Sequence, residues 1–215
     1  MNITTEQMRF WSPEVRELKP YTPGEQPKIQ NILKLNTNEN PYPPSPKVVE
    51  AVQKVLANSA DVLRLYPDPD ASELKQAIAK QQNVPVDTVF VGNGSDEVLA
   101  HIFKAFFVQE QPVLYPDITY SFYPVYSQFF GVKTKILPLN DNFEIVVDDY
   151  KQANGGIIIT NPNAPTSIDL GLAAIEEILQ ANPDSVVVID EAYVDFGAES
   201  AVKLVEKYEN LVVCQ

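Results

Sequence analysis

The sequence of 215 residues contains one cysteine and one histidine, which excludes an internal disulfide and a structural zinc site. Basic residues are also scarce: 16 Lys and Arg against 29 Asp and Glu give a formal net charge of −13. This balance argues against nucleic-acid binding, which needs clustered cations. No apolar run is long enough to span a membrane, and no apolar signal segment opens the sequence. We therefore expect a soluble, cytoplasmic protein with no metal, membrane or nucleic-acid partner.

Apolar residues make up 45% of the sequence, which is enough for a sizeable core. Short apolar runs alternate with stretches of helical periodicity. The predicted strands cover residues 88–91, 113–115, 133–137, 157–160, 186–189 and 211–213. The predicted helices cover residues 48–56, 74–78, 95–107, 119–130, 172–179 and 201–208. This alternation predicts an α/β fold, a mostly parallel sheet with helices on both faces.

The first part of the chain has a different character. Residues 1–35 are rich in proline and lack periodicity, so we expect an N-terminal arm that lies on another surface. We expect residues 36–215 to form part of one large domain.

Ligands of parallel sheets bind at the carboxyl ends of the strands, so the residues after each strand are candidates. Gly94, Ser95 and Asp96 follow the predicted strand 88–91 and open a helix. Glycine allows close backbone approach, and a helix N-terminus suits a phosphate. A plain turn with Ser95 as the N-cap is the alternative, and a short glycine motif alone favours it.

Asp190 ends the apolar run 186–189, and a buried carboxylate there needs a cation or hydrogen-bond donors. A protonated heteroaromatic ring nitrogen would serve, although capping of the next turn explains the residue equally well. The loop 161–166 holds two prolines, and Asn161 or Asn163 could donate to a ligand oxygen. Its composition alone favours a solvated turn.

The segment 119–130 carries several aromatic residues. One of the aromatic residues at its start, Tyr120, Phe122, Tyr123 and Tyr126, could stack on a planar ligand, but core packing is expected for Phe122, Tyr126, Phe129 and Phe130. His101 lies off the apolar stripe of its predicted helix, so we expect it at the surface or in helix packing rather than in catalysis.

The order of five motifs identifies a family resemblance that no single motif carries. They are Leu35-Asn-Thr-Asn-Glu-Asn-Pro-Tyr42, Arg64-Leu-Tyr-Pro-Asp68, Val91-Gly-Asn-Gly-Ser-Asp-Glu97, Asn161-Pro-Asn-Ala-Pro-Thr166 and Asp190-Glu-Ala-Tyr193. In this order the chain resembles the fold-type I aminotransferases that depend on pyridoxal 5'-phosphate (PLP), in the class II subgroup, and most closely the histidinol-phosphate aminotransferases. The resemblance runs from about Leu18 to the last residue.

The resemblance implies roles for the residues around the cofactor. Gly94, Ser95 and Asp96 would cradle its phosphate, and Tyr120 would stack on its ring. Asp190 would pair with the ring nitrogen, and Tyr193 would bond the phenolic oxygen. Ala164 stands where the family has an asparagine, so Asn163 or Asn161 would take that contact, and Ser167 replaces the usual glycine.

The remaining implied residues lie in the first third of the chain. Tyr66 would reach the phosphate of a neighbouring subunit in a homodimer. The substrate would be contacted by Tyr21, Asn38, Glu39 and Asn40.

The implied activity is amino transfer between L-histidinol phosphate and 2-oxoglutarate or glutamate in histidine biosynthesis. The alternatives are another PLP-dependent aminotransferase or decarboxylase of this fold, or a non-catalytic fragment that binds a phosphate ligand. In the family the Schiff-base lysine and the small C-terminal domain lie beyond the position of Gln215. We therefore expect the chain as given to be inactive by itself.

Overall fold

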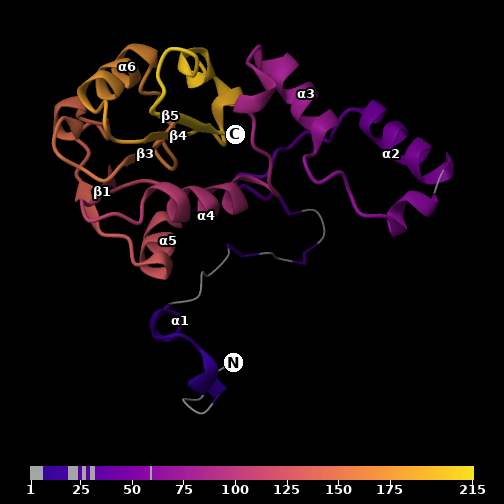
Figure 1. Cartoon of the computed structure of the whole chain (residues 1–215), viewed down its shortest axis with the longest axis horizontal. Coiled ribbons are helices and arrows are strands. Elements are labelled where there is room, and N and C mark those ends of the chain that lie inside the picture. The colour runs from indigo at the N-terminus through magenta and orange to yellow at the C-terminus, as the bar shows by residue number, and fades with distance from the viewer. Residues whose placement is uncertain (1–6, 19–23, 26–27, 30–31, 59) are drawn as a thin grey trace. The chain divides into compact units, whose positions relative to one another are not determined.

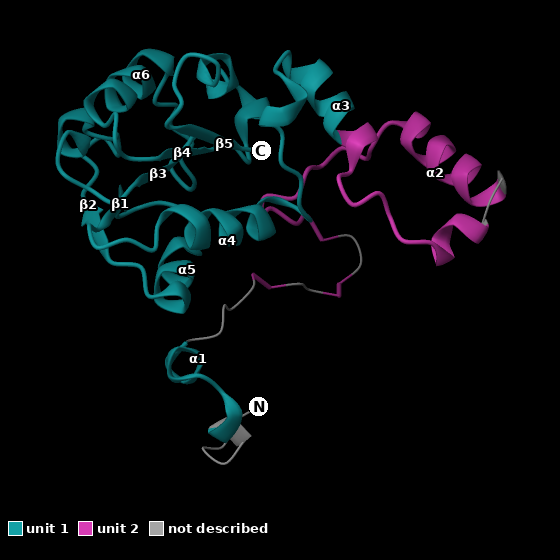
Figure 2. Cartoon of the chain, viewed as in Figure 1, with its two compact units in different colours: residues 1–19, 75–215 teal, residues 20–74 magenta. Residues whose placement is uncertain are grey.

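The computed structural model describes residues 7–18, 24–25, 28–29, 32–58 and 60–215. The chain divides into two compact units (Figure 2). One, here called the sheet unit, consists of residues 1–19 and 75–215, and the second unit consists of residues 20–74. The predicted boundary between an arm and a large domain near residue 35 stays a prediction.

Five short strands form one parallel sheet in the sheet unit (Figure 1). They are β1 (Val113–Pro116), β2 (Thr134–Leu137), β3 (Ile157–Thr160), β4 (Val187–Asp190) and β5 (Leu211–Cys214), in the order β2-β1-β3-β4-β5. β1, β3 and β4 are buried along their whole length. Both sheet faces are covered, which explains why their sequences are continuously apolar rather than alternating. The predicted α/β fold with a parallel sheet is confirmed.

Helices cover the two sheet faces separately. α4 (Ser95–Phe106) and α5 (Tyr123–Phe130) pack on one face, whereas α6 (Leu172–Ala181) packs on the other together with the short 3-10 helices η4 (Val147–Tyr150) and η6 (Ala201–Leu204). The strands serve both faces by alternation: Ile157 and Ile159 point toward α6, and Ile158 points toward α4.

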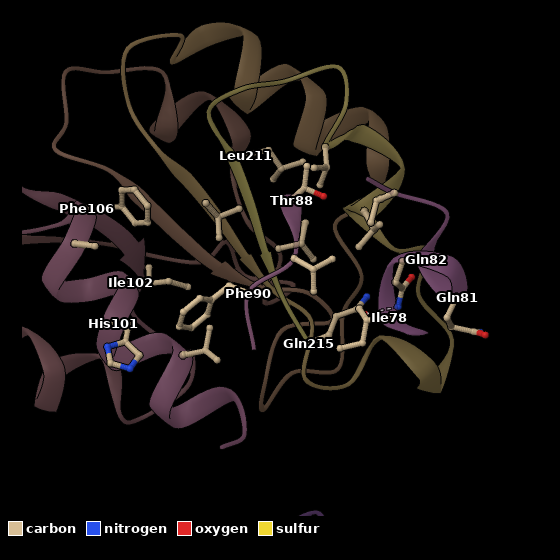
Figure 3. Close-up of a pocket in the computed structure, with 18 of the residues that line it drawn as sticks. Ile78, Gln81, Gln82, Thr88, Phe90, His101, Ile102, Phe106, Leu211 and Gln215 are labelled. Carbon is tan, nitrogen blue, oxygen red and sulfur yellow. Dashed lines mark hydrogen bonds between the residues drawn. The ribbon is translucent and has the colours of Figure 1, made fainter. Parts of the chain in front are cut away.

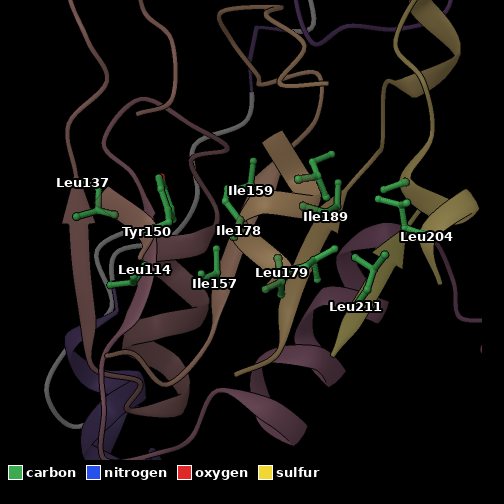
Figure 4. Packing of buried hydrophobic residues seen from close by; sticks show 13 residues of the cluster. Leu114, Leu137, Tyr150, Ile157, Ile159, Ile178, Leu179, Ile189, Leu204 and Leu211 are labelled. Atoms are coloured by element: carbon green, nitrogen blue, oxygen red, sulfur yellow. The ribbon is translucent and has the colours of Figure 1, made fainter. Parts of the chain in front are cut away.

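The face under α6 is called here the aliphatic face. Its buried residues are almost all Leu, Ile and Val, as Figure 4 shows for Ile157, Ile159 and Ile178. The face under α4 and α5 is called the aromatic face, because Phe103, Phe107, Tyr115, Tyr123 and Tyr126 lie in its core. Each fully buried side chain of this size contributes roughly 1.5–3 kcal/mol to folding.

The other helices are α1 (Pro13–Glu17), α2 (Pro46–Asn58) and α3 (Ser72–Gln82), with the 3-10 helices η1 (Gln7–Phe10), η2 (Ala60–Arg64), η3 (Val86–Thr88) and η5 (Val194–Phe196). The predicted helices 48–56 and 74–78 are confirmed by α2 and α3. No helix formed by the described residues has both the length and the apolarity needed to cross a membrane.

Three predicted elements need correction. The strand expected at 88–91 is absent: η3 ends at Thr88, the following residues form no ladder, and Phe90 is 63% exposed. Strand-forming residues become a strand only when a neighbouring strand pairs with them, and residues 88–91 have none in the described chain. The helix expected at 119–130 begins only at Tyr123, because Pro124 favours the first turn of a helix. The helix expected at 201–208 is the single turn η6.

Candidate functional site at the carboxyl ends of the strands

Asp190 is the last residue of β4, and only 3% of it is exposed. Its Oδ2 accepts a hydrogen bond of 2.7 Å from the Tyr123 hydroxyl, and its Oδ1 accepts one of 3.3 Å from the Ala192 amide. Burial raises the pKa of Asp190 and the nearby carboxylates of Asp96 and Glu191 add to this, whereas the two hydrogen bonds oppose it.

This buried carboxylate has no cationic partner among the described residues. The ion pairs that the described lysines and arginines form are with other carboxylates, and none of them involves Asp190. A buried carboxylate is costly unless it is paired, so the arrangement suits a ligand that brings a positively charged donor.

The adjacent carboxylate, Glu191, is in the opposite situation. It is 1% exposed and accepts hydrogen bonds from the Ser200 hydroxyl at 2.6 Å, the Ala201 amide at 2.5 Å and the Gln215 amide group at 2.8 Å. These donors tie the end of β5 and the start of η6 to Glu191. Glu191 is therefore satisfied by the protein itself, and of the two carboxylates Asp190 is the one left for a ligand.

A group of tyrosines connects Asp190 to the start of α4. The rings of Tyr123 and Tyr120 meet edge to face, with centroids 5.6 Å apart. The Tyr120 hydroxyl donates to Asp96 Oδ1 at 2.8 Å, and the Tyr126 hydroxyl donates to the Asp96 carbonyl oxygen at 2.8 Å. The structure thus brings Asp96, Tyr120 and Asp190 together at one edge of the sheet.

At the turn before α4 the N-cap residue provides no side-chain cap, and the Glu97 carboxylate accepts a hydrogen bond from the Asn93 amide just before it. Gly94 is the N-cap residue with φ +82°, a conformation that favours glycine. The interpretation of Ser95 as the N-cap is therefore wrong, since Ser95 is the first helical residue. The N-terminus of the 12-residue helix α4 carries partial positive charge at the Gly94–Asp96 turn, which suits an anion.

In the loop after β3, Asn161 and Asn163 are buried and bonded within the protein, so the interpretation of these two side chains as part of a solvated turn is wrong. Asn163 is 3% exposed; its amide donates to the Ile118 carbonyl at 2.9 Å and to Thr166 Oγ1 at 3.2 Å, and its oxygen accepts from Thr160 Oγ1 at 2.6 Å. Both N–H groups of the Asn163 amide are thus in use, so a hydrogen bond donated by Asn163 to a ligand requires exchange of one of them. Asn161 donates to Asp169 Oδ1 at 2.9 Å. The peptide bonds before Pro162 and Pro165 are cis.

Tyr193 lies three residues after Asp190, is partly buried and occupies the N-cap position of η5.

The other predicted residues belong to the second unit. Tyr66 is 100% exposed. Glu39 forms an ion pair of 2.7 Å with Lys34, and Asn40 Oδ1 accepts from the Tyr42 amide at 2.9 Å.

Two further predicted substrate contacts concern the same unit. Asn38 adopts φ +51° in an exposed turn. Tyr21 lies outside the described residues.

The sequence offers Tyr123 only as one of several aromatic residues near the helix start, without its bond to Asp190, and Tyr126 only as a core residue. Tyr126 is buried as expected, but its hydroxyl also bonds Asp96. Phe122 and Phe130 pack against the aromatic face as expected, whereas Phe129 is 44% exposed, so its assignment to the core is wrong. Pro124 is the signal that could have drawn attention to Tyr123, because it places this residue in the first turn of α5, at the strand ends.

A hollow of about 940 Å³ lies elsewhere in the sheet unit, between α3, α4 and β5 (Figure 3). Its lining is mostly apolar, and none of the sequence-predicted ligand-binding residues belongs to it. His101 lines it with its ring 5.8 Å from that of Phe90, which confirms a surface and packing position.

Residues 30–215 match the family described as Aminotransferase class I and II, and the chain belongs to this family. A curated relative, the histidinol-phosphate aminotransferase of Acinetobacter baumannii, is 81% identical over the whole chain. The chain spans 60% of the length of that relative.

Solved structures confirm the fold. An aspartate aminotransferase variant from Thermus thermophilus matches 96% of this chain and 58% of its own with a TM-score of 0.79 and 20% identity. A histidinol-phosphate aminotransferase from Sinorhizobium meliloti, solved in complex with pyridoxal-5'-phosphate, matches 82% of this chain and 49% of its own with a TM-score of 0.70 and 20% identity.

Proposed function

We propose that the protein of which this chain forms part binds PLP at the carboxyl edge of the sheet and transfers the amino group between L-histidinol phosphate and 2-oxoglutarate or glutamate. The observation that carries the proposal is the buried Asp190 carboxylate, which pairs with no described lysine or arginine and lies beside Tyr120 and the turn that opens α4. The name of the relative that is 81% identical supports the choice of substrate.

The residues present fit the chemistry of PLP. Asp190 would pair with the protonated ring nitrogen, and Tyr120 would lie against the ring face. The amides of Gly94, Ser95 and Asp96 would hold the phosphate, since the α4 N-terminus carries partial positive charge. Tyr193 would donate to the phenolic oxygen, and Asn163 would shape the loop beside it.

When bound, PLP supplies an electron-withdrawing ring that stabilises negative charge at the carbon bearing the amino group. The residues of this chain keep the bound ring electron-withdrawing. Asp190 holds the ring nitrogen protonated, because an adjacent carboxylate favours the charged form of a base. Tyr120 restricts the ring to one plane, and its own position is fixed by the hydrogen bond to Asp96.

The substrate and the subunit arrangement complete the proposal. Asn38, Glu39, Asn40 and Tyr21 would contact the substrate. Tyr66, whose side chain is fully exposed, would reach the phosphate bound by the other subunit of a homodimer. The enzyme would act in histidine biosynthesis in the cytoplasm.

The test is an assay of the protein made to the full length of its curated relatives, with PLP, L-histidinol phosphate and 2-oxoglutarate. We expect glutamate formation, and a change in the absorbance of bound PLP on addition of L-histidinol phosphate alone, because 2-oxoglutarate has no amino group to give to the cofactor. Activity only with a different amine would contradict the substrate, and absence of specific PLP binding would contradict the cofactor site.

A further inference from the structure

Tyr123 connects the packing of the aromatic face to the carboxylate of Asp190. Its ring is 0% exposed and lies among Phe103, Tyr115 and Tyr120, with centroid distances of 6.0, 6.0 and 5.6 Å. Its hydroxyl donates to Asp190 Oδ2 at 2.7 Å. A ring fixed on several sides holds its hydroxyl at one point, so the bond also fixes the orientation of the carboxylate.

The direction of this hydrogen bond is permanent. Burial raises the pKa of Tyr123 well above its usual value, and the Asp190 carboxylate raises it further, so the hydroxyl keeps its proton at any physiological pH. Of the two donors to Asp190, the Ala192 amide is the more distant, at 3.3 Å. Tyr123 is therefore the main group of the protein that stabilises the ionised form of this buried carboxylate.

We propose that Tyr123 is a positioning residue for the cofactor: its hydroxyl holds the Asp190 carboxylate ionised and aimed so that the free lone pairs face the ring nitrogen of PLP. This inference rests on the proposed function. Packing alone would explain a buried tyrosine at this position. The proposal adds that its hydroxyl determines how Asp190 binds the ring nitrogen of PLP.

The experiment compares two ligands on three forms of the full-length protein. The ligands are PLP and 1-deazapyridoxal 5'-phosphate, in which carbon replaces the ring nitrogen. The forms are wild type, Tyr123→Phe, and the control Tyr150→Phe, which removes the hydroxyl of a similarly buried tyrosine from the aliphatic face. Dissociation constants are measured by absorbance, and thermal unfolding of each form reports on folding.

Wild type is expected to prefer PLP over the deaza compound by about a hundredfold, because a charge-assisted hydrogen bond is lost with the nitrogen. Tyr123→Phe is expected to weaken PLP binding by about tenfold and binding of the deaza compound by less than about twofold. Tyr150→Phe is expected to change neither by more than about twofold.

The outcomes separate the inference from the function on which it rests. Equal affinity of wild type for both ligands would refute the role of Asp190. A preference for PLP that persists unchanged in Tyr123→Phe, or an equal loss for both ligands, would overturn the role of Tyr123 alone. In an Asp190→Asn background, Tyr123→Phe should cost no further PLP affinity, and an additional tenfold loss there would also overturn it.

Discussion

The two faces of the same sheet are built from different residues and have different consequences. The aliphatic face is filled mainly by Leu, Ile and Val, whose side chains can only pack. The aromatic face is also buried, but the hydroxyls of Tyr123 and Tyr126 extend from it to Asp190 and Asp96. A core residue can therefore serve stability with its ring and a binding site with its polar end.

Two adjacent residues at the end of β4, Asp190 and Glu191, show the same difference between the two faces. Alternation along the strand points Asp190 toward the aromatic face and Glu191 toward η6 on the aliphatic face. The protein supplies three donors to Glu191, whereas no described lysine or arginine pairs with Asp190. One carboxylate thus serves the fold, and the other is available to a ligand.

The largest effect should come from a cavity on the aliphatic face. Ile159→Ala removes a fully buried side chain and should lower the free energy of unfolding by about 3 kcal/mol. Denaturant titration gives this value, and PLP affinity of the folded variant should stay within about twofold of wild type. A large loss of PLP affinity in the folded variant would show that the aliphatic face also determines ligand binding, and would contradict the difference between the two faces.

Asp190→Asn should act on the ligand instead. The amide keeps the shape but loses the charge, so PLP affinity should fall by about a hundredfold, equivalent to about 2.7 kcal/mol. Absorbance titration with PLP measures this loss. An unchanged affinity would mean that the buried carboxylate serves something other than the ring nitrogen.

Glu191→Gln should have a smaller effect, on stability. The new amide group would face one of the donors from Ser200, Ala201 and Gln215, and an unsatisfied buried donor costs about 1–2 kcal/mol. Denaturant titration should find this loss, with PLP affinity close to wild type. A variant as stable as wild type would show that these three bonds do not hold the fold.

The smallest expected effect is on the stability of the protein without cofactor, which the buried Asp190 carboxylate lowers. Its pKa is raised in the folded protein, so the penalty is absent below the unfolded-state pKa and complete above the folded-state pKa. Without PLP, the stability of Asp190→Asn relative to wild type should therefore be greater at neutral pH than at acid pH, because only wild type carries the buried charge. Urea titrations at several pH values provide the comparison; a difference that grows toward low pH would reverse the assigned sign.

The sequence predicted the five strands of the sheet well, because a continuously apolar run as short as 157–160, followed by a proline-rich loop, is typical of a buried strand. It failed at residues 88–91, where a strand depends on a neighbour that local pattern does not reveal. The residues expected to bind ligand at the strand ends could be named from the motifs. Tyr123 could not, because its bond to Asp190 joins residues 67 positions apart and depends on how α5 packs.

A crystal structure of the full-length protein with PLP tests the central claim most directly, through the position of the pyridine nitrogen. The account predicts this nitrogen at about 2.8 Å from a carboxylate oxygen of Asp190, with the Tyr123 hydroxyl still bonded to the other side of that carboxylate. A cofactor whose ring nitrogen faces solvent or another residue, with Asp190 bonded only to protein, would contradict it.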